Sequence, residues 1–275
     1  MKNKFLTGLL AAAALGTGLL SMAAPASAFD IKSRDEAPAD FKDILQDFRA
    51  FVGEESRYLS PETIKAKEVD LSKLTLKFDH DVKVFFIGET AGGYRNRLDF
   101  KATTDSKVET GKIFGDTSCN TGDSGFTNFS KFCANPNDAL QGKVAPDKPL
   151  NVGDWASIGS FKAGTKFDFQ LVSNDINGGI SQNEVKGIFG LNQALNPDGL
   201  QHVMAYYYKD YLVLGFEDLW GGGDKDYNDT VFAIDIGKAN VREAANVPEP
   251  SAAAAMFGIA ALGLMKTRRR TQAVR

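Results

Sequence analysis

The stretch 203-VMAYYYKDYLVLGFEDLWGGGDKDYNDTVFAIDI-236 contains three short apolar runs, and it decides the fold expected for this chain. Runs of this length, rich in aromatic and aliphatic residues, are typical of β-strands. Only Lys209 and Asp210 separate Val203–Tyr208 from Tyr211–Phe216, which predicts a tight hairpin. A longer acidic loop then leads to a third predicted strand, Thr230–Ile236.

The same pattern recurs upstream and predicts six more strands: Leu71–Phe78, Val82–Ile87, Leu98–Thr103, Trp155–Phe161, Lys166–Val172 and Val185–Phe189. Nine short strands without intervening helices favour an all-β, jelly-roll-like β-sandwich over residues 66–240. In the segment 29–65, Ala37–Glu54 carries apolar residues at helical spacing and predicts one amphipathic helix. Residues 241–246 are expected to be a linker.

The loop between the last two strands is unusually acidic. Within thirteen residues it carries five carboxylates: Glu217, Asp218, Asp224, Asp226 and Asp229. Like charges at this density repel one another unless water or a cation relieves them. The three glycines at 221–223 allow the backbone to adopt positive φ and to turn carbonyl groups inward.

The spacing of the polar residues favours a calcium site. Asp224, Asp226 and Asn228 alternate as the first three ligands of an EF-hand do, but no flanking helices are expected and Asp229 replaces the glycine of that motif. Oxygen ligands suit calcium, whereas zinc prefers nitrogen and sulfur. The alternative is a solvated turn whose carboxylates cap backbone N–H groups. We expect one ion, with ligands from Asp224, Asp226, Asn228, Asp229, Glu217 and Asp218.

The same residues carry a resemblance to a known family. Phe216–Leu219, Gly222–Asp229 and Val231-Phe232 resemble the motif of the secreted bacterial family known as domain of unknown function 4114. Segments 86–96 and 159–165 are similar to parts that accompany this motif, so the resemblance extends over 71–237. It implies a calcium site and a location at the cell surface, and no reaction. Trp220 departs from the family pattern and adds an aromatic side chain that could contact a ligand.

The two ends of the chain carry targeting signals. Residues 1–28 have the basic, apolar and small-residue order of a cleavable secretory signal peptide. At the other end, Val247-Pro248-Glu249-Pro250 precedes a short apolar helix and a basic cluster. This order resembles the PEP-CTERM sorting signal of Gram-negative bacteria, which implies transient inner-membrane anchoring, processing by exosortase and delivery to the cell surface or biofilm matrix. The alternative is a simple C-terminal anchor.

Charge and cysteine usage agree with export. Once both signals are removed, residues 29–246 carry 25 basic and 34 acidic side chains, a balance that disfavours nucleic acid and favours cations as partners. The two cysteines, Cys119 and Cys133, are expected to form a disulfide in an oxidising compartment. A metal or catalytic thiol pair is the alternative, but the only histidines are His80 and His202.

Enzymatic activity is not expected. No nucleophile elbow, phosphate-binding loop or zinc-helix motif occurs, although Glu217 with Asp229 is a conceivable carboxylate pair for glycoside hydrolysis. We expect a binding or adhesion module for exopolysaccharide or other glycans, with Trp220 and Tyr206–Tyr208 as stacking candidates. The alternative is a purely structural matrix protein without a ligand.

Overall fold

The computed structural model describes residues 29–52, 71, 74–90, 93–105, 107–120, 133 and 144–245. The expected signal peptide at 1–28 and the expected sorting signal at 247–275 lie outside this part of the chain. Within it, no helix combines the length and the apolar character that crossing a membrane requires.

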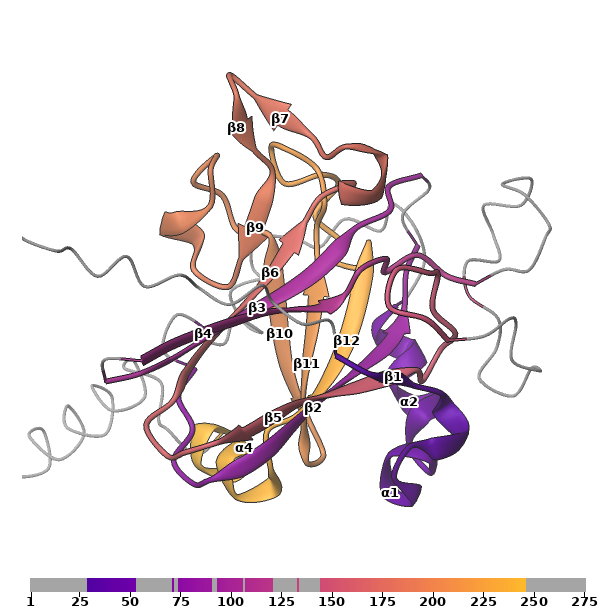
Figure 1. The fold of residues 1–275 in the computed structure, drawn as a ribbon, viewed down its shortest axis with the longest axis vertical. Helices are drawn as coiled ribbons and strands as arrows, with labels where there is room; N and C mark the ends of the chain where they lie inside the picture. Colours follow the sequence, from indigo (N-terminus) through magenta and orange to yellow (C-terminus); the bar gives the residue numbers. More distant parts are fainter. Residues whose placement is uncertain are drawn as a thin grey trace, which may run out of the picture.

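The larger sheet has six antiparallel strands in the order β1-β5-β2-β12-β11-β10 (Figure 1). Their bounds are β1 Ile31–Lys32, β5 Trp155–Phe161, β2 His80–Gly88, β12 Thr230–Asp235, β11 Tyr211–Phe216 and β10 Val203–Tyr208. The predicted hairpin at Lys209-Asp210 is confirmed, because β10 and β11 pair up to Tyr208 and Tyr211. Consecutive strands β10, β11 and β12 form a meander in one sheet, whereas strands of a jelly roll alternate between sheets.

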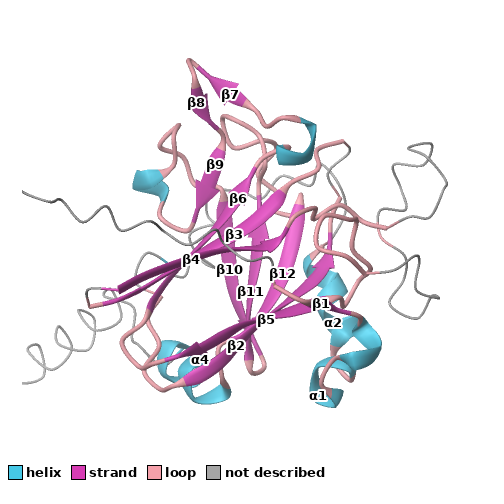
Figure 2. Cartoon of the chain, in the orientation of Figure 1, coloured by secondary structure: helices cyan, strands magenta, loops and turns pink. Residues whose placement is uncertain are grey.

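The smaller sheet has four antiparallel strands in the order β4-β3-β6-β9, and a two-stranded ribbon lies beyond it (Figure 2). Its strands are β4 Lys107–Phe114, β3 Arg97–Thr104, β6 Lys166–Val172 and β9 Ile188–Gly190, and the ribbon consists of β7 Ser181–Gln182 and β8 Val185–Lys186. Aromatic side chains join the two sheets: Phe114 stacks on Phe232 at 5.9 Å between ring centroids, and Phe100 meets Phe161 edge-on at 6.0 Å. The β-sandwich predicted from the sequence is therefore present.

Two strand predictions differ from the structure, and one long strand was not predicted. In the described part of 71–78, Thr75 forms only an isolated bridge with Lys166. The predicted strand at 185–189 divides at Gly187, because the N–H and C=O of Gly187 bond to Ile180 and Ser173 instead of continuing one ladder. Strand β4 was not predicted, since its first four residues are exposed and lack an apolar alternation.

The N-terminal segment is part of the sandwich. The single helix expected at 37–54 is replaced by short turns: η1 Arg34–Glu36, α1 Ala39–Lys42, α2 Leu45–Phe48 and η2 Arg49–Phe51. Its apolar stripe is nevertheless buried, and the Phe41 ring stacks on Phe85 at 3.9 Å. Helices this short are marginal alone, so packing on the sheet decides their geometry. Strand β1 also pairs with β5, which places the start of the domain before residue 66.

The linker expected at 241–246 is wrong for its described residues. Helix α4 spans Lys238–Ala245, and Asn240 and Val241 on it are buried. The Asn240 side-chain oxygen accepts the N–H groups of Lys77 and Phe78 at 2.7 and 2.9 Å. These bonds fix the helix to the sandwich. Two further short helices in the described part of the chain are η4 Asp175–Asn177 and η5 Gln193–Leu195.

The predicted disulfide between Cys119 and Cys133 is present, with 5.0 Å between the two Cα atoms. It lies beside the end of β2, where the Glu89 N–H contacts the Cys133 sulfur at 3.2 Å. The bridge thus fastens the segment after β4 to the same end of the sandwich that carries the acidic loop.

Candidate metal centre

Strand pairing brings both ends of the acidic loop together. Phe216 at the end of β11 pairs with Thr230 at the start of β12, so residues 217–229 form one closed excursion. Glycines 221–223 all have positive φ, and so do Lys225 and Tyr227. This run of left-handed backbone folds the loop back over the end of β11. Glycine is favoured at 221–223 because it adopts positive φ without strain, and because it is small.

Three carboxylates converge inside this loop. Each of Glu217, Asp224 and Asp226 offers an oxygen that lies within 4.8 Å of those of the other two. Glu217 is fully buried, and its Oε1 accepts the Tyr227 N–H at 2.8 Å. Its Oε2 is also buried and has no hydrogen-bond partner within the described part of the chain. One oxygen of Glu217 is thus anchored and the other is free to bind a ligand.

Burial and the neighbouring carboxylates disfavour the ionised form of Glu217 in this triad. Burial raises the pKa of Glu217 to about 8, and the charges of Asp226 and Asp224 contribute in the same direction. Burial also raises the pKa of Asp229, and the charges of Asp218 and Glu217 add to that increase. A bound cation would reverse the effect, because its field stabilises ionised carboxylates.

Two glycines allow the loop to pack closely against the end of β11. A Cβ atom on Gly223 would lie 2.0 Å from Glu217 Oε2, so any larger residue would displace this carboxylate. A Cβ atom on Gly215, inside β11, would lie 2.1 Å from the Tyr227 carbonyl oxygen. Glycine within a strand often marks such a close backbone approach.

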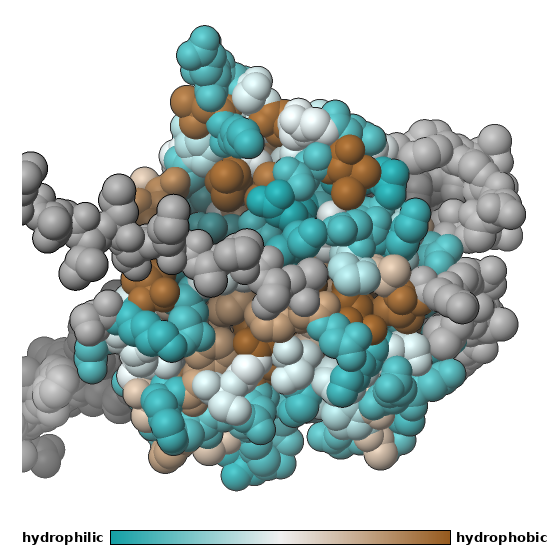
Figure 3. Space-filling view, viewed as in Figure 1, coloured by the Kyte–Doolittle hydropathy of each residue, from teal (hydrophilic) through white to brown (hydrophobic). Residues whose placement is uncertain are grey.

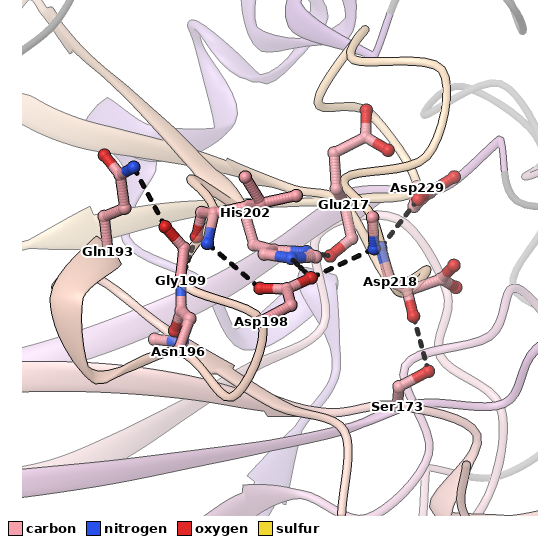
Figure 4. A network of polar contacts seen from close by, with 12 residues as sticks. Ser173, Gln193, Asn196, Asp198, Gly199, His202, Glu217, Asp218 and Asp229 are labelled. Atoms are coloured by element: carbon pink, nitrogen blue, oxygen red, sulfur yellow. Dashed lines mark hydrogen bonds and ion pairs between the residues drawn. The ribbon is translucent and has the colours of Figure 1, made fainter. Parts of the chain in front are cut away.

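The other three expected ligands do not share this arrangement. The Asp218 carboxylate accepts from Asn96 Nδ2 at 2.8 Å, and Asp229 accepts the Asp218 N–H at 2.8 Å. The side-chain oxygen of Asn228 accepts from the Thr90 hydroxyl. Figure 4 shows the Glu217 and Asp218 carboxylates extending in different directions, as consecutive residues leaving a strand do. Of the six expected ligands, the structure thus brings together the carboxylates of Glu217, Asp224 and Asp226, whereas the side chains of Asp218, Asn228 and Asp229 accept the hydrogen bonds just described.

A second layer of residues supports the loop, and no sequence pattern indicated it. His202 is fully buried, stacks on Phe189 at 3.7 Å between ring centroids, and contacts the Glu217 carbonyl oxygen through Nδ1 at 3.1 Å. Its Nε2 contacts Asp198 Oδ2 at 2.9 Å, and that oxygen also accepts the Gly221 N–H at 3.0 Å (Figure 4). These contacts tie the loop to the segment before β10.

Trp220 is only half-exposed. Its ring meets Phe189 edge-on at 5.9 Å, and its Nε1 is buried close to Gly187. The indole therefore clamps the acidic loop to the segment between β8 and β9, and only part of it could contact a ligand. The expected stacking platform at Tyr206–Tyr208 is likewise half-buried, because these side chains pack on the core and on Phe51.

The triad is an oxygen-only site. Carboxylates and nearby backbone carbonyls suit a hard cation such as calcium, which takes six to eight oxygens at about 2.3–2.6 Å. Residues 161–237, which include the whole loop, match the family model of a domain of unknown function, DUF4114. No curated protein and no solved structure matches the chain significantly.

Proposed function

We propose that this chain is an exported, exosortase-processed protein of the cell surface or exopolysaccharide matrix, built on a calcium-binding β-sandwich that acts as a binding or adhesion module. Calcium ties the end of β11 to the start of β12 through Glu217, Asp224 and Asp226. The protein has no catalytic role in this proposal.

The observation that carries the calcium proposal is the carboxylate of Glu217. It is fully buried, it faces two other carboxylates, and its Oε2 has no partner among the described residues. A buried polar group that lacks a hydrogen-bond partner costs about 1–3 kcal/mol. The cost is higher when the group is charged, as an ionised Glu217 would be. A cation at this oxygen removes that cost and the mutual repulsion of the three groups.

The binding role is supported by the surface around the loop. Exposed apolar side chains belong to segments at the end of the sandwich that carries β7, β8 and the acidic loop: Ile176, Val185, Leu195, Leu200 and Leu219. Figure 3 shows brown apolar patches between polar residues at this end. Exposed apolar patches with a polar rim are typical of interaction surfaces. An ion that rigidifies the loop would also fix Leu219 and Trp220 in one arrangement.

Export rests on the sequence signals at 1–28 and 247–250 and is consistent with the disulfide. If exosortase processes the tail, protein recovered from the surface of its host lacks residues after about Pro250. Changing Pro248 and Pro250 to alanine should then leave the longer form in the membrane. Intact mass spectrometry that finds Arg275 on surface material would reject this route.

Thermal unfolding in millimolar calcium and in excess chelator tests the ion site. We expect calcium to raise the melting temperature of the wild-type protein, whereas Asp224→Asn with Asp226→Asn removes most of that increase. Asp105→Asn, in the exposed turn after β3, is the matched control and keeps the full calcium response. Identical wild-type curves in both solutions would contradict calcium binding.

A glycan array probed with and without calcium tests the ligand. Calcium-dependent retention on one class of sugar supports an adhesion module. Calcium-dependent stability without any retained glycan would instead favour the purely structural matrix protein.

A further inference from the structure

A second polar group lies at the same end of the sandwich as the triad. Glu89 follows β2, Thr117 follows β4 and Asp218 follows β11, so three separate strands supply it. All three side chains are nearly inaccessible, with exposed fractions of 5 %, 0 % and 2 %. Charged and hydroxyl groups are rarely buried to this degree unless they are paired or bind an ion.

Hydrogen bonds connect these residues into a ring. Glu89 Oε1 accepts the Cys119 N–H at 2.9 Å, and two residues earlier the Thr117 N–H donates to the Asn96 carbonyl oxygen at 2.8 Å. Asn96 in turn donates its Nδ2 to Asp218 Oδ2 at 2.8 Å. One half of the ring thus runs from β2 through the segment after β4 to the end of β11.

The other half closes through the acidic loop. The Asp218 N–H donates to Asp229 Oδ2 at 2.8 Å, and the neighbouring residue Asn228 accepts the Thr90 N–H at 3.2 Å through its carbonyl oxygen. Since Thr90 follows Glu89, the ring returns to its start. The position of each member is therefore fixed by backbone bonds as well as by side-chain bonds.

Two oxygens of this ring are left without partners. Glu89 Oε2 and Thr117 Oγ1 are both fully buried atoms with no hydrogen-bond partner in the described part of the chain. Nearby Asp116 differs, because its carboxylate accepts from Arg95 and from the Ser118 N–H and hydroxyl at 3.0 and 2.6 Å. Glu89 Oε2 and Thr117 Oγ1 therefore lack the partners that Asp116 has, and Thr230 Oγ1, next to Asp229, is a further buried oxygen without a partner among the described residues.

Charge near Glu89 is also unbalanced. Burial raises the pKa of Glu89 well above its ordinary range, and the charges of Asp116 and Asp218 raise it further, while Arg95 lowers it. Arg95 forms its ion pair with Asp116, so its positive charge is shared between that carboxylate and Glu89. Protonating Glu89 would remove its charge but would not give Thr117 Oγ1 a partner.

We propose that Glu89 and Thr117, together with Asp218, hold a second hard divalent cation between the two sheets, separate from the ion of the Glu217 triad. The chemical class of the ion follows from the oxygen-only donors, and calcium is the probe of choice. Because Glu89 and Asp218 follow different strands of the larger sheet, and Thr117 follows the edge strand of the smaller one, this ion joins the two layers.

Calcium stoichiometry tests the second site and separates it from the first. The full-length protein is dialysed against calcium at neutral pH. The number of calcium ions bound per chain is then measured by inductively coupled plasma mass spectrometry. We expect two ions in the wild type, one in Glu89→Gln and one in Glu217→Gln. Thr117→Val should weaken the second ion at least about tenfold, since it removes a ligand but keeps the shape. Glu243→Gln, exposed on α4, should retain both ions.

The outcomes distinguish this site from the function proposed above. A single wild-type ion that Glu217→Gln removes and Glu89→Gln keeps would overturn the second site and leave the first. A single ion with the opposite pattern would support the second site and reject the triad. If Glu89→Gln fails to fold, the Thr117→Val titration decides, and two ions of unchanged affinity in that variant would overturn the proposal.

Discussion

Replacing Glu217 by glutamine should stabilise the ion-free protein and remove its calcium response. Glutamine keeps the shape of the side chain, and its Oε1 can still accept the Tyr227 N–H at 2.8 Å. It removes the buried charge that faces Asp224 and Asp226. In excess chelator the variant should therefore resist urea better than the wild type, although most buried substitutions destabilise a protein.

The magnitude follows from the pKa of Glu217. Its ordinary value of 4.5 applies to the unfolded chain, and the native value is about 8. At 1.36 kcal/mol per pH unit, this difference corresponds to about 5 kcal/mol as an upper limit. Because the native pKa is the higher one, the contribution to stability is fully present below pH 4.5 and is lost as the pH rises through 8. The advantage of glutamine should grow over that range.

The assay is urea unfolding of both proteins at pH 5, 6.5 and 8, in chelator and in calcium. Glu243→Gln controls for the loss of one exposed carboxylate. Calcium at about a hundred times its dissociation constant should stabilise the wild type by about 2.7 kcal/mol and Glu217→Gln much less. The reasoning is refuted if, in chelator, the variant is less stable than the wild type by the same amount at all three pH values.

Three further predictions concern the scaffold. Gly215→Ala should cost about 1–3 kcal/mol and weaken calcium binding in a titration, because its Cβ would meet the Tyr227 carbonyl, whereas Gly93→Ala, which faces open space, should leave calcium binding unchanged. Reducing the Cys119–Cys133 bridge should lower the free energy of unfolding by about 3 kcal/mol, measured in urea with and without reductant; an unchanged midpoint would contradict it. Phe41→Ala should cost about 3–5 kcal/mol in the same assay, and a loss below 1 kcal/mol would mean that the N-terminal segment is dispensable.

The sequence predicted the strands that carry a clear period of two and missed those that do not. Strands β5, β6, β10 and β11 have the predicted bounds, because each combines buried apolar positions with a turn at its end. Strand β4 lacks that pattern, since it lies at the edge of the smaller sheet with an exposed first half. The division at Gly187 depends on bonds to Ile180 and Ser173, which no local pattern encodes.

The candidate site could be located from the sequence but not resolved into its parts. The density of carboxylates identified the loop. The Glu217 and Asp218 side chains, however, point in different directions, and this depends on where β11 ends. Neither Glu89 nor Thr117 was predicted as a ligand, because each is a single polar residue after a strand. Only the pairing of distant strands brings them to Asp218 through Asn96.

The position of a bound calcium ion would show directly whether Glu217, Asp224 and Asp226 form the metal site. Crystals of the full-length protein grown in millimolar calcium would give an anomalous peak at the ion. We expect a peak within about 2.3–2.6 Å of Glu217 Oε2 and of oxygens from Asp224 and Asp226. A well-ordered loop without a peak at these three carboxylates would contradict it.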